Sequence, residues 1–150
     1  MFQELALQIA QKAHAGQVDK AGKDYILHPM TVASYMDTDI EKTIAYLHDV
    51  LEDTDVTVDA LRKIFPNEIV DTLITLTHRK DESYFEYIQR VSKSKLAKKV
   101  MQIISRNAGV KNRIEDGTSE FFRSFLPDAC GAIGCVLLSW SESTLDECAF

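Results

Sequence analysis

The nine residues 47–55, LHDVLEDTD, hold one histidine and four carboxylates beside two leucines and a valine. Residues four apart on a helix share a face, so a helical stretch would place His48 over Glu52. Asp49 would lie over Asp53 in the same way. The resulting stripe of imidazole nitrogen and carboxylate oxygen suits a hard or borderline divalent cation such as manganese, magnesium, iron or zinc. The stretch therefore predicts a metal site.

A second histidine, His28, directly precedes a proline, where a loop would hold it rigidly. The charge pattern predicts that His28, His48 and Asp49 hold the cation, which makes a bound water easier to deprotonate. Glu52 and Asp53 would then orient that water or shuttle its proton.

A simpler alternative is that the acidic residues are merely solvated at a helix end. Carboxylates at a helix C-terminus oppose the macrodipole, at about a few tenths of a kcal/mol each, so their crowding favours a compensating cation. Other residues of similar type rank lower. His14 fits a packing or helix-end position better than a ligand, and His78 fits the surface. Tyr84 and Tyr87, three apart on a helix, favour core packing.

The elements that must position these residues are helices. The spacing of apolar residues, helix caps and helix breakers predicts helices at about 2–15 and 29–36. A third helix is expected to be capped by Asp37 or Asp39 and to carry LHDVLED on its last two turns. Four more helices are predicted in TVDALRKIF, NEIVDTLITLTH, DESYFEYIQRVSK and KLAKKVMQII. No strand alternation competes before residue 100. The first two thirds of the chain are therefore predicted to be all-α.

Length and charge limit the class of protein. A chain of 150 residues is expected to form one compact domain. The net charge of −6 disfavours broad binding to nucleic acid or an anionic membrane, because both require a basic surface. Neither a membrane span nor a signal-peptide layout is apparent, which predicts a cytoplasmic protein. These features fix no oligomeric state.

Three segments, taken together, resemble a known family: AHAGQVDKAGKDYILHP, AYLHDVLEDTDVT and LTHRKDESYFEYIQRV. They are similar to the HD-domain phosphohydrolases, specifically the small alarmone hydrolases and the hydrolase half of RelA/SpoT-type proteins. The resemblance covers about residues 6–100. It implies an all-α HD-domain helical bundle and a hydrolase that removes the 3′-pyrophosphate from guanosine tetraphosphate (ppGpp) or pentaphosphate (pppGpp), a small-molecule nucleotide substrate.

The resemblance also assigns roles by position. The matching metal ligands are His28, His48 and Asp49. The implied cofactor is Mn²⁺, with other divalent cations as alternatives. Glu52 and Asp53 match the acidic pair that positions the attacking water. Lys20, in VDKAG, matches a basic residue of the loop that lines the nucleotide pocket.

The resemblance breaks at the last metal-ligand motif. The family reads KLADNLxN where this chain reads KKVMQIISRN, so the expected Asp is absent. Met101 and Gln102 stand on that helix instead, and neither supplies an anionic oxygen. Asn107 falls near the family's Asn. Loss of one carboxylate from a four-ligand site is expected to weaken metal binding severely.

Composition shifts at the same place. Residues 101–150 hold all three Cys, the only Trp and four of the six Gly, and no CxxC pair suggests a zinc ribbon or a disulfide framework. Codons for Met-Gln-Ile, read from the G of ATG, are compatible with the family's Ala-Asp-Asn. We therefore divide the chain into an HD core, 1–100, and a divergent tail, 101–150, and hypothesise a frameshift near codon 100. The rival interpretation is a genuine tail in which Glu115 or Asp116 replaces the missing ligand.

Three functions follow from these observations. The first is a manganese-dependent ppGpp 3′-pyrophosphohydrolase by descent, impaired by the missing ligand. The second is a hydrolase of another phosphorylated nucleotide with the same metal site, which a substrate panel distinguishes. The third is a non-catalytic alarmone-binding module or a degenerate HD protein. Nucleotide binding without turnover would identify the binding module.

Overall fold

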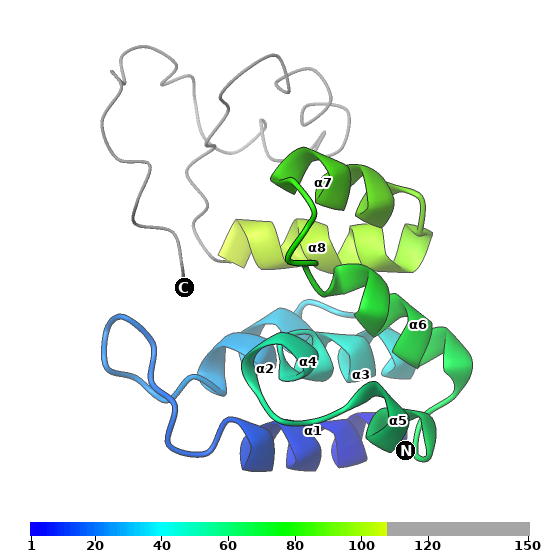
Figure 1. The fold of residues 1–150 in the computed structure, drawn as a ribbon. Helices are drawn as coiled ribbons and strands as arrows, with labels where there is room; N and C mark the ends of the chain where they lie inside the picture. The colour runs from blue at the N-terminus through cyan, green and yellow to red at the C-terminus, as the bar shows by residue number, and fades with distance from the viewer. Residues whose placement is uncertain (108–150) are drawn as a thin grey trace, which may run out of the picture.

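The computed structural model describes residues 1–107, which form eight helices and no strand (Figure 1). The helices are α1 (Phe2–Ala13), α2 (Leu27–Ser34), α3 (Asp39–Leu47), α4 (Val50–Asp53), α5 (Val58–Arg62), α6 (Asn67–Leu76), α7 (Tyr84–Ser92) and α8 (Lys95–Asn107). The all-α prediction is confirmed for this part of the chain. None of these helices is long and apolar enough to cross a membrane.

Helix α3 lies at the centre of the described fold. It packs against α1, α2, α6 and α8, and Ile44 and Leu47 on it are fully buried. Leu73 of α6 and Val100 of α8 are fully buried in the same core. Complete burial of such a side chain contributes about 1.5–3 kcal/mol. The core thus fixes α3 firmly, and the end of α3 carries the predicted metal ligands.

The N-terminus of α3 is capped by Thr38, so the predicted caps, Asp37 and Asp39, are wrong. The Thr38 hydroxyl accepts a hydrogen bond from the Glu41 amide, and the Glu41 carboxylate accepts one from the Thr38 amide. This reciprocal pair is a capping box, whose sequence signature is Thr followed three residues later by Glu. Lys99 of α8 donates to Glu41 at 2.7 Å and ties α8 to this cap.

The prediction that LHDVLED lies on the last two turns of one helix is also wrong, because the helix breaks inside it. α3 ends at Leu47, and Asp49 has φ −96° and ψ −9°, away from regular helical values. His48 Nδ1 donates to the Ala45 carbonyl at 2.7 Å, so a side chain satisfies one carbonyl at the end of α3. Neighbouring side chains that diverge on a continuous helix can therefore meet here.

Helix α8 continues past the predicted domain boundary at residue 100. It extends to Asn107, and Met101 is buried in the core. The stretch 101–107 therefore continues the helix. The division into a core and a tail stays a prediction, because Glu115, Asp116 and all three cysteines lie outside the described residues.

Candidate metal centre

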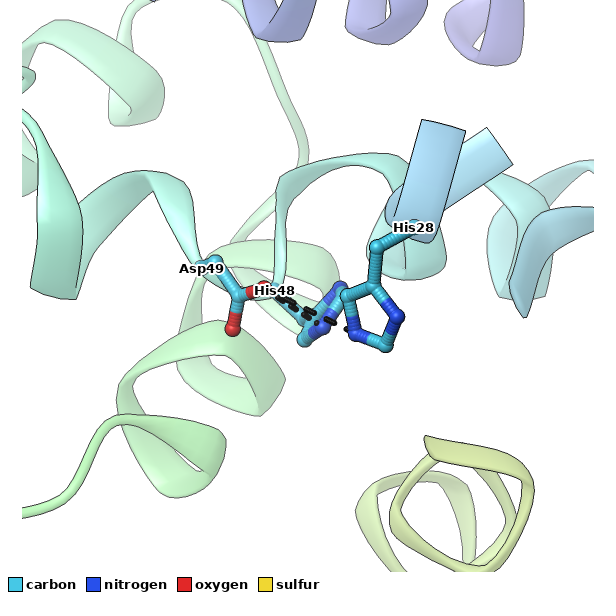
Figure 2. A group of neighbouring side chains, drawn as sticks. All are labelled: His28, His48 and Asp49. Carbon is cyan, nitrogen blue, oxygen red and sulfur yellow. Dashed lines mark ion pairs between the residues drawn. The ribbon is translucent and has the colours of Figure 1, made fainter. Parts of the chain in front are cut away.

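Three side chains from two places in the fold converge as the sequence predicts. His28 lies in the first turn of α2, and His48 and Asp49 occupy the break between α3 and α4. One potential ligand atom from each residue lies within 4.8 Å of the others (Figure 2). Asp49 Oδ2 is 2.9 Å from His48 Nε2 and 3.9 Å from His28 Nε2. The three residues offer two imidazole nitrogens and a carboxylate oxygen to one point.

The tautomer of His48 decides which of its ring nitrogens could bind a metal. Since a carbonyl only accepts, His48 Nδ1 carries the hydrogen in its 2.7 Å bond to the Ala45 oxygen. In the neutral ring, the lone pair on Nε2 then faces Asp49. Nε2 is buried and has no hydrogen-bond partner among the described residues, although Asp49 Oδ2 is close. Two electron-rich atoms at this separation repel unless a proton or a metal cation lies between them, so the donor set fits a metal.

The electrostatics of Asp49 and His28 agree with this arrangement. Burial opposes ionisation of Asp49, but the nearby charge of His48 and the hydrogen bond from Tyr25 lower its pKa to about 2. Burial opposes protonation of His48, yet the Asp49 carboxylate raises its pKa, so a bound metal would replace a proton that this pair favours. Burial and the charge of His48 lower the pKa of His28. Asp49 is therefore anionic and His28 neutral at physiological pH, which are the protonation states of metal ligands.

The predicted acidic pair, Glu52 and Asp53, is exposed on α4, three and four residues after Asp49. The Glu52 carboxylate accepts a hydrogen bond from the His78 amide at 3.3 Å. Partial burial raises the pKa of Glu52, and the neighbouring Asp53 and Asp49 charges add to this shift. Partial burial and the Asp49 charge likewise raise the pKa of Asp53. Both carboxylates are therefore better proton acceptors than ordinary ones.

The structure places Lys20 at the exposed tip of the loop between α1 and α2. The Asp19 carboxylate shapes this tip by accepting the amides of Ala21 and Lys23 at 2.8 and 2.9 Å. Gly22 adopts φ 76°, a conformation that favours glycine. Lys20 forms no hydrogen bond or ion pair with other described residues. Its substrate-binding role stays a prediction.

Sequence reasoning missed Tyr25, whose hydroxyl donates to Asp49 Oδ2 at 2.7 Å. Burial, followed by the Asp49 charge, raises the pKa of Tyr25, so this hydroxyl stays protonated. The one sequence feature that points to Tyr25 is its position three residues before His28.

The other aromatic residues considered from the sequence have mixed outcomes. His14 caps the end of α1 and His78 is exposed, as predicted. Tyr87 is buried as predicted, but Tyr84 is 52% exposed, so its predicted core position is wrong.

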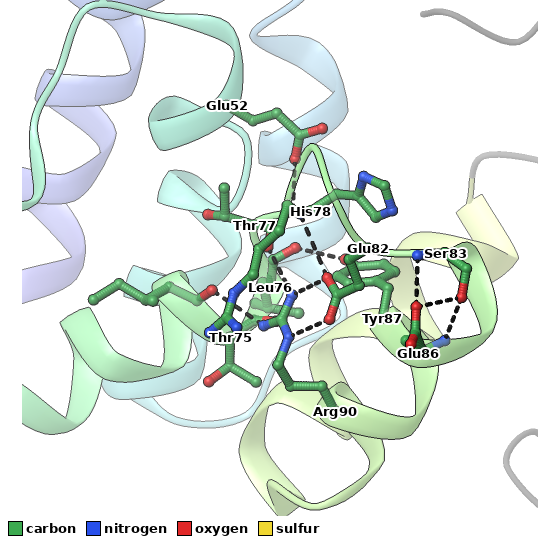
Figure 3. Close-up of polar contacts among 12 residues, drawn as sticks. Glu52, Thr75, Leu76, Thr77, His78, Glu82, Ser83, Glu86, Tyr87 and Arg90 are labelled. Atoms are coloured by element: carbon green, nitrogen blue, oxygen red, sulfur yellow. Dashed lines mark hydrogen bonds and ion pairs between the residues drawn. The ribbon is translucent and has the colours of Figure 1, made fainter.

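Sequence reasoning also missed the contacts that hold the loop after α6 (Figure 3). The Arg90 guanidinium donates to the carbonyls of Thr75 and Thr77 at 2.7 and 3.0 Å. It also forms two hydrogen bonds to the Glu82 carboxylate, at 2.7 and 2.6 Å. The loop held in this way is the one whose His78 amide contacts Glu52. Arg90 therefore anchors a loop that borders the acidic pair.

Helix α8, which packs against α2 and α3, carries no Asp or Glu. Its inner face is apolar: Val100 and Met101 are buried, and Ile103 and Ile104 are partly buried against the core. The carboxylate that the family resemblance predicts as the fourth ligand is therefore absent from this helix.

Comparison with known proteins identifies the family. The family model described as "HD domain" matches residues 6–106. The chain belongs to the HD domain family. The match covers all eight described helices apart from the ends of α1 and α8, and it includes His28, His48 and Asp49.

Curated relatives of this HD domain have modest identity. A guanosine-3′,5′-bis(diphosphate) 3′-pyrophosphohydrolase of Borreliella burgdorferi is 41% identical over 76 residues, covering 48% of this chain and 11% of the relative. The bifunctional (p)ppGpp synthase/hydrolase SpoT of Escherichia coli K12 is 28% identical over 117 residues, covering 75% of this chain and 16% of the relative. The chain thus spans only a small part of the length of these relatives.

A solved structure shares the fold of this HD domain. It is described as "A metazoan ortholog of SpoT hydrolyzes ppGpp and plays a role in starvation responses". The TM-score is 0.64 at 19% sequence identity, over 84% of this chain and 82% of that one. At this identity the likeness shows the fold alone.

Proposed function

We propose that this HD domain is a metal-dependent phosphohydrolase that removes the 3′-pyrophosphate from ppGpp or pppGpp, with Mn²⁺ as the metal. The observation that carries the proposal is the convergence of His28, His48 and Asp49 within 4.8 Å. The names of the relatives from Borreliella burgdorferi and Escherichia coli support the substrate. The products would be GDP or GTP and pyrophosphate.

Each residue of the site has a proposed role. His28, His48 and Asp49 would hold the metal, since a mixed imidazole and carboxylate set suits manganese, iron or zinc. A bound divalent cation would supply charge neutralisation for the pyrophosphate leaving group. Glu52 and Asp53 would orient the attacking water and accept its proton, because their raised pKa values improve them as bases.

The substrate side of the proposal rests on charge. Lys20, exposed in its loop, would pair with the phosphates of the nucleotide. The overall charge of −6 supports a local cationic contact with a small nucleotide rather than binding to nucleic acid or a membrane. A cytoplasmic location is part of the same proposal.

Pyrophosphate release from ppGpp in the presence of MnCl₂ tests this function. The parent protein should turn over, and His48→Ala and Asp49→Ala should each abolish turnover. The matched control is Asp59→Ala, which removes an exposed carboxylate from the first turn of α5 and should leave turnover unchanged. A folded parent protein without pyrophosphate release would refute the proposal, as would full activity in His48→Ala.

The absence of a carboxylate from α8 favours one second candidate, a non-catalytic module that binds the alarmone. Three ligands hold a cation more weakly than four, so nucleotide binding could outlast catalysis. Calorimetric titration with ppGpp distinguishes the two functions. Binding with no pyrophosphate release would support the module, and turnover would exclude it. A panel of other phosphorylated nucleotides tests the remaining alternative substrate class.

A further inference from the structure

The side chain of Tyr25 lies between the metal centre and the acidic pair. Its hydroxyl is 2.7 Å from Asp49 Oδ2 and 3.4 Å from Asp53 Oδ2. We propose that Tyr25 is a positioning residue that orients the Asp49 carboxylate toward a divalent cation and keeps Asp53 beside it. This inference rests on the metal centre of the proposed function.

Tyr25 donates to the same Asp49 oxygen that faces the two imidazoles. Asp49 Oδ2, which accepts from Tyr25, is also the oxygen 2.9 Å from His48 Nε2 and 3.9 Å from His28 Nε2. The oxygen that faces both imidazoles is therefore also fixed by a hydrogen bond from the Tyr25 hydroxyl. A carboxylate held in this way keeps Oδ2 directed toward the two imidazoles. Outer hydrogen bonds of this kind orient metal ligands in proteins.

Tyr25 is itself held on several sides. Its ring contacts those of His14 and His28, with centroids 4.9 and 6.1 Å apart. Its amide donates to the Gln17 carbonyl at 3.0 Å. A phenol packed in this way has little rotamer freedom, so its hydroxyl is already in place before metal binds.

A second bridge runs parallel to the first. The Gln17 side-chain amide donates to the backbone carbonyl of Asp53 at 3.1 Å, and its oxygen accepts from His14 Nδ1 at 2.7 Å. His14 is 3% exposed, so this bridge starts from a buried residue at the end of α1. The end of α1 is thus joined to the end of α4. These hydrogen bonds hold the loop between α1 and α2, which carries Tyr25, beside the acidic pair.

A purely structural role for Tyr25 predicts a different result from a positioning role. Loss of a structural hydrogen bond lowers stability without changing metal affinity. Tyr87 provides the matched control, because its hydroxyl donates to the Leu76 carbonyl at 2.5 Å and touches no proposed ligand. Tyr25→Phe and Tyr87→Phe therefore remove the same atom from two buried or partly buried rings.

The test measures Mn²⁺ binding to the 150-residue chain by the electron paramagnetic resonance signal of free Mn²⁺, with thermal unfolding of the metal-free proteins alongside. Tyr25→Phe should weaken Mn²⁺ affinity about 10- to 100-fold, as removal of outer partners of metal ligands does. Tyr87→Phe should lower the melting temperature and keep the parent affinity.

The outcomes separate this inference from the proposed function. A folded Tyr25→Phe that binds Mn²⁺ as tightly as the parent overturns the inference, even if the parent hydrolyses ppGpp. Weakened Mn²⁺ binding in Tyr25→Phe supports the inference, even if the parent releases no pyrophosphate and the proposed substrate fails. A parent protein that binds no Mn²⁺ overturns the inference together with the metal centre.

Discussion

The backbone amide of His78 donates a hydrogen bond to Oε2 of Glu52 at 3.3 Å, joining the loop after α6 to the acidic pair on α4. The two residues are 26 positions apart, so the contact exists only because α6 and α7 hold the loop in place. A backbone donor cannot be removed by a side-chain change. Glu52 can therefore be altered while its partner stays fixed.

Glu52→Gln should separate position from chemistry. The amide oxygen of Gln still accepts from His78, but Gln cannot take a proton from water. We expect turnover of ppGpp to fall by about 10²- to 10⁴-fold, the usual contribution of a general base, with Mn²⁺ affinity unchanged. Pyrophosphate release and Mn²⁺ titration check this result. Glu68→Gln, at an exposed position in α6, is the control. Parent-like turnover in Glu52→Gln would exclude Glu52 as the base.

Arg90→Lys should destabilise the loop that carries His78. Arg90 donates to the carbonyls of Thr75 and Thr77 and pairs with Glu82, and a single ammonium cannot reproduce this fork (Figure 3). We expect a loss of about 2–3 kcal/mol in the free energy of unfolding, measured with urea.

Arg62→Lys is the control for this substitution, because Arg62 pairs with Asp71 at 2.7 Å on the surface. Exposed pairs contribute about 0–1 kcal/mol. Equal losses in the two variants would show that the contacts of Arg90 add nothing beyond an ordinary surface pair.

The sequence predicts the helices and the convergence of His28, His48 and Asp49, because both depend on local spacing and on quoted motifs. It does not predict the break at His48, since the Ala45 carbonyl contact that accompanies it depends on the rotamer of one side chain. It also does not predict Tyr25 or Arg90 as supporting residues. Asp49 lies 24 positions from Tyr25, and the partners of Arg90 lie 8 to 16 positions away, so these contacts form only in the packed fold. The cap at Thr38, in contrast, was readable from the Thr and Glu spacing.

Glu82→Gln should change how stability depends on pH. Hydrogen bonds from Arg90 lower the pKa of Glu82 to about 2, below its ordinary value of 4.5. Because the folded-state pKa is depressed, the stabilisation is complete above the ordinary value and is lost as the pH falls toward about 2. The parent should therefore lose stability more steeply than Glu82→Gln across this window. Urea unfolding of metal-free protein at several pH values measures the slopes, and identical slopes would contradict the assignment.

The double variant Glu115→Gln/Asp116→Asn tests the two interpretations of the tail. If residues 101–150 arise from a frameshift, neither carboxylate contributes to the metal centre, and Mn²⁺ affinity should equal that of the parent. If the tail replaces the missing ligand, the loss of one anionic oxygen should weaken affinity severely, toward that of Asp49→Ala. Mn²⁺ titration distinguishes these results, with Asp49→Ala as the weak-binding reference. We expect parent-like affinity, because the change of composition after residue 100 favours the frameshift, in which neither carboxylate belongs to the site. A large loss would instead identify the tail as part of the site.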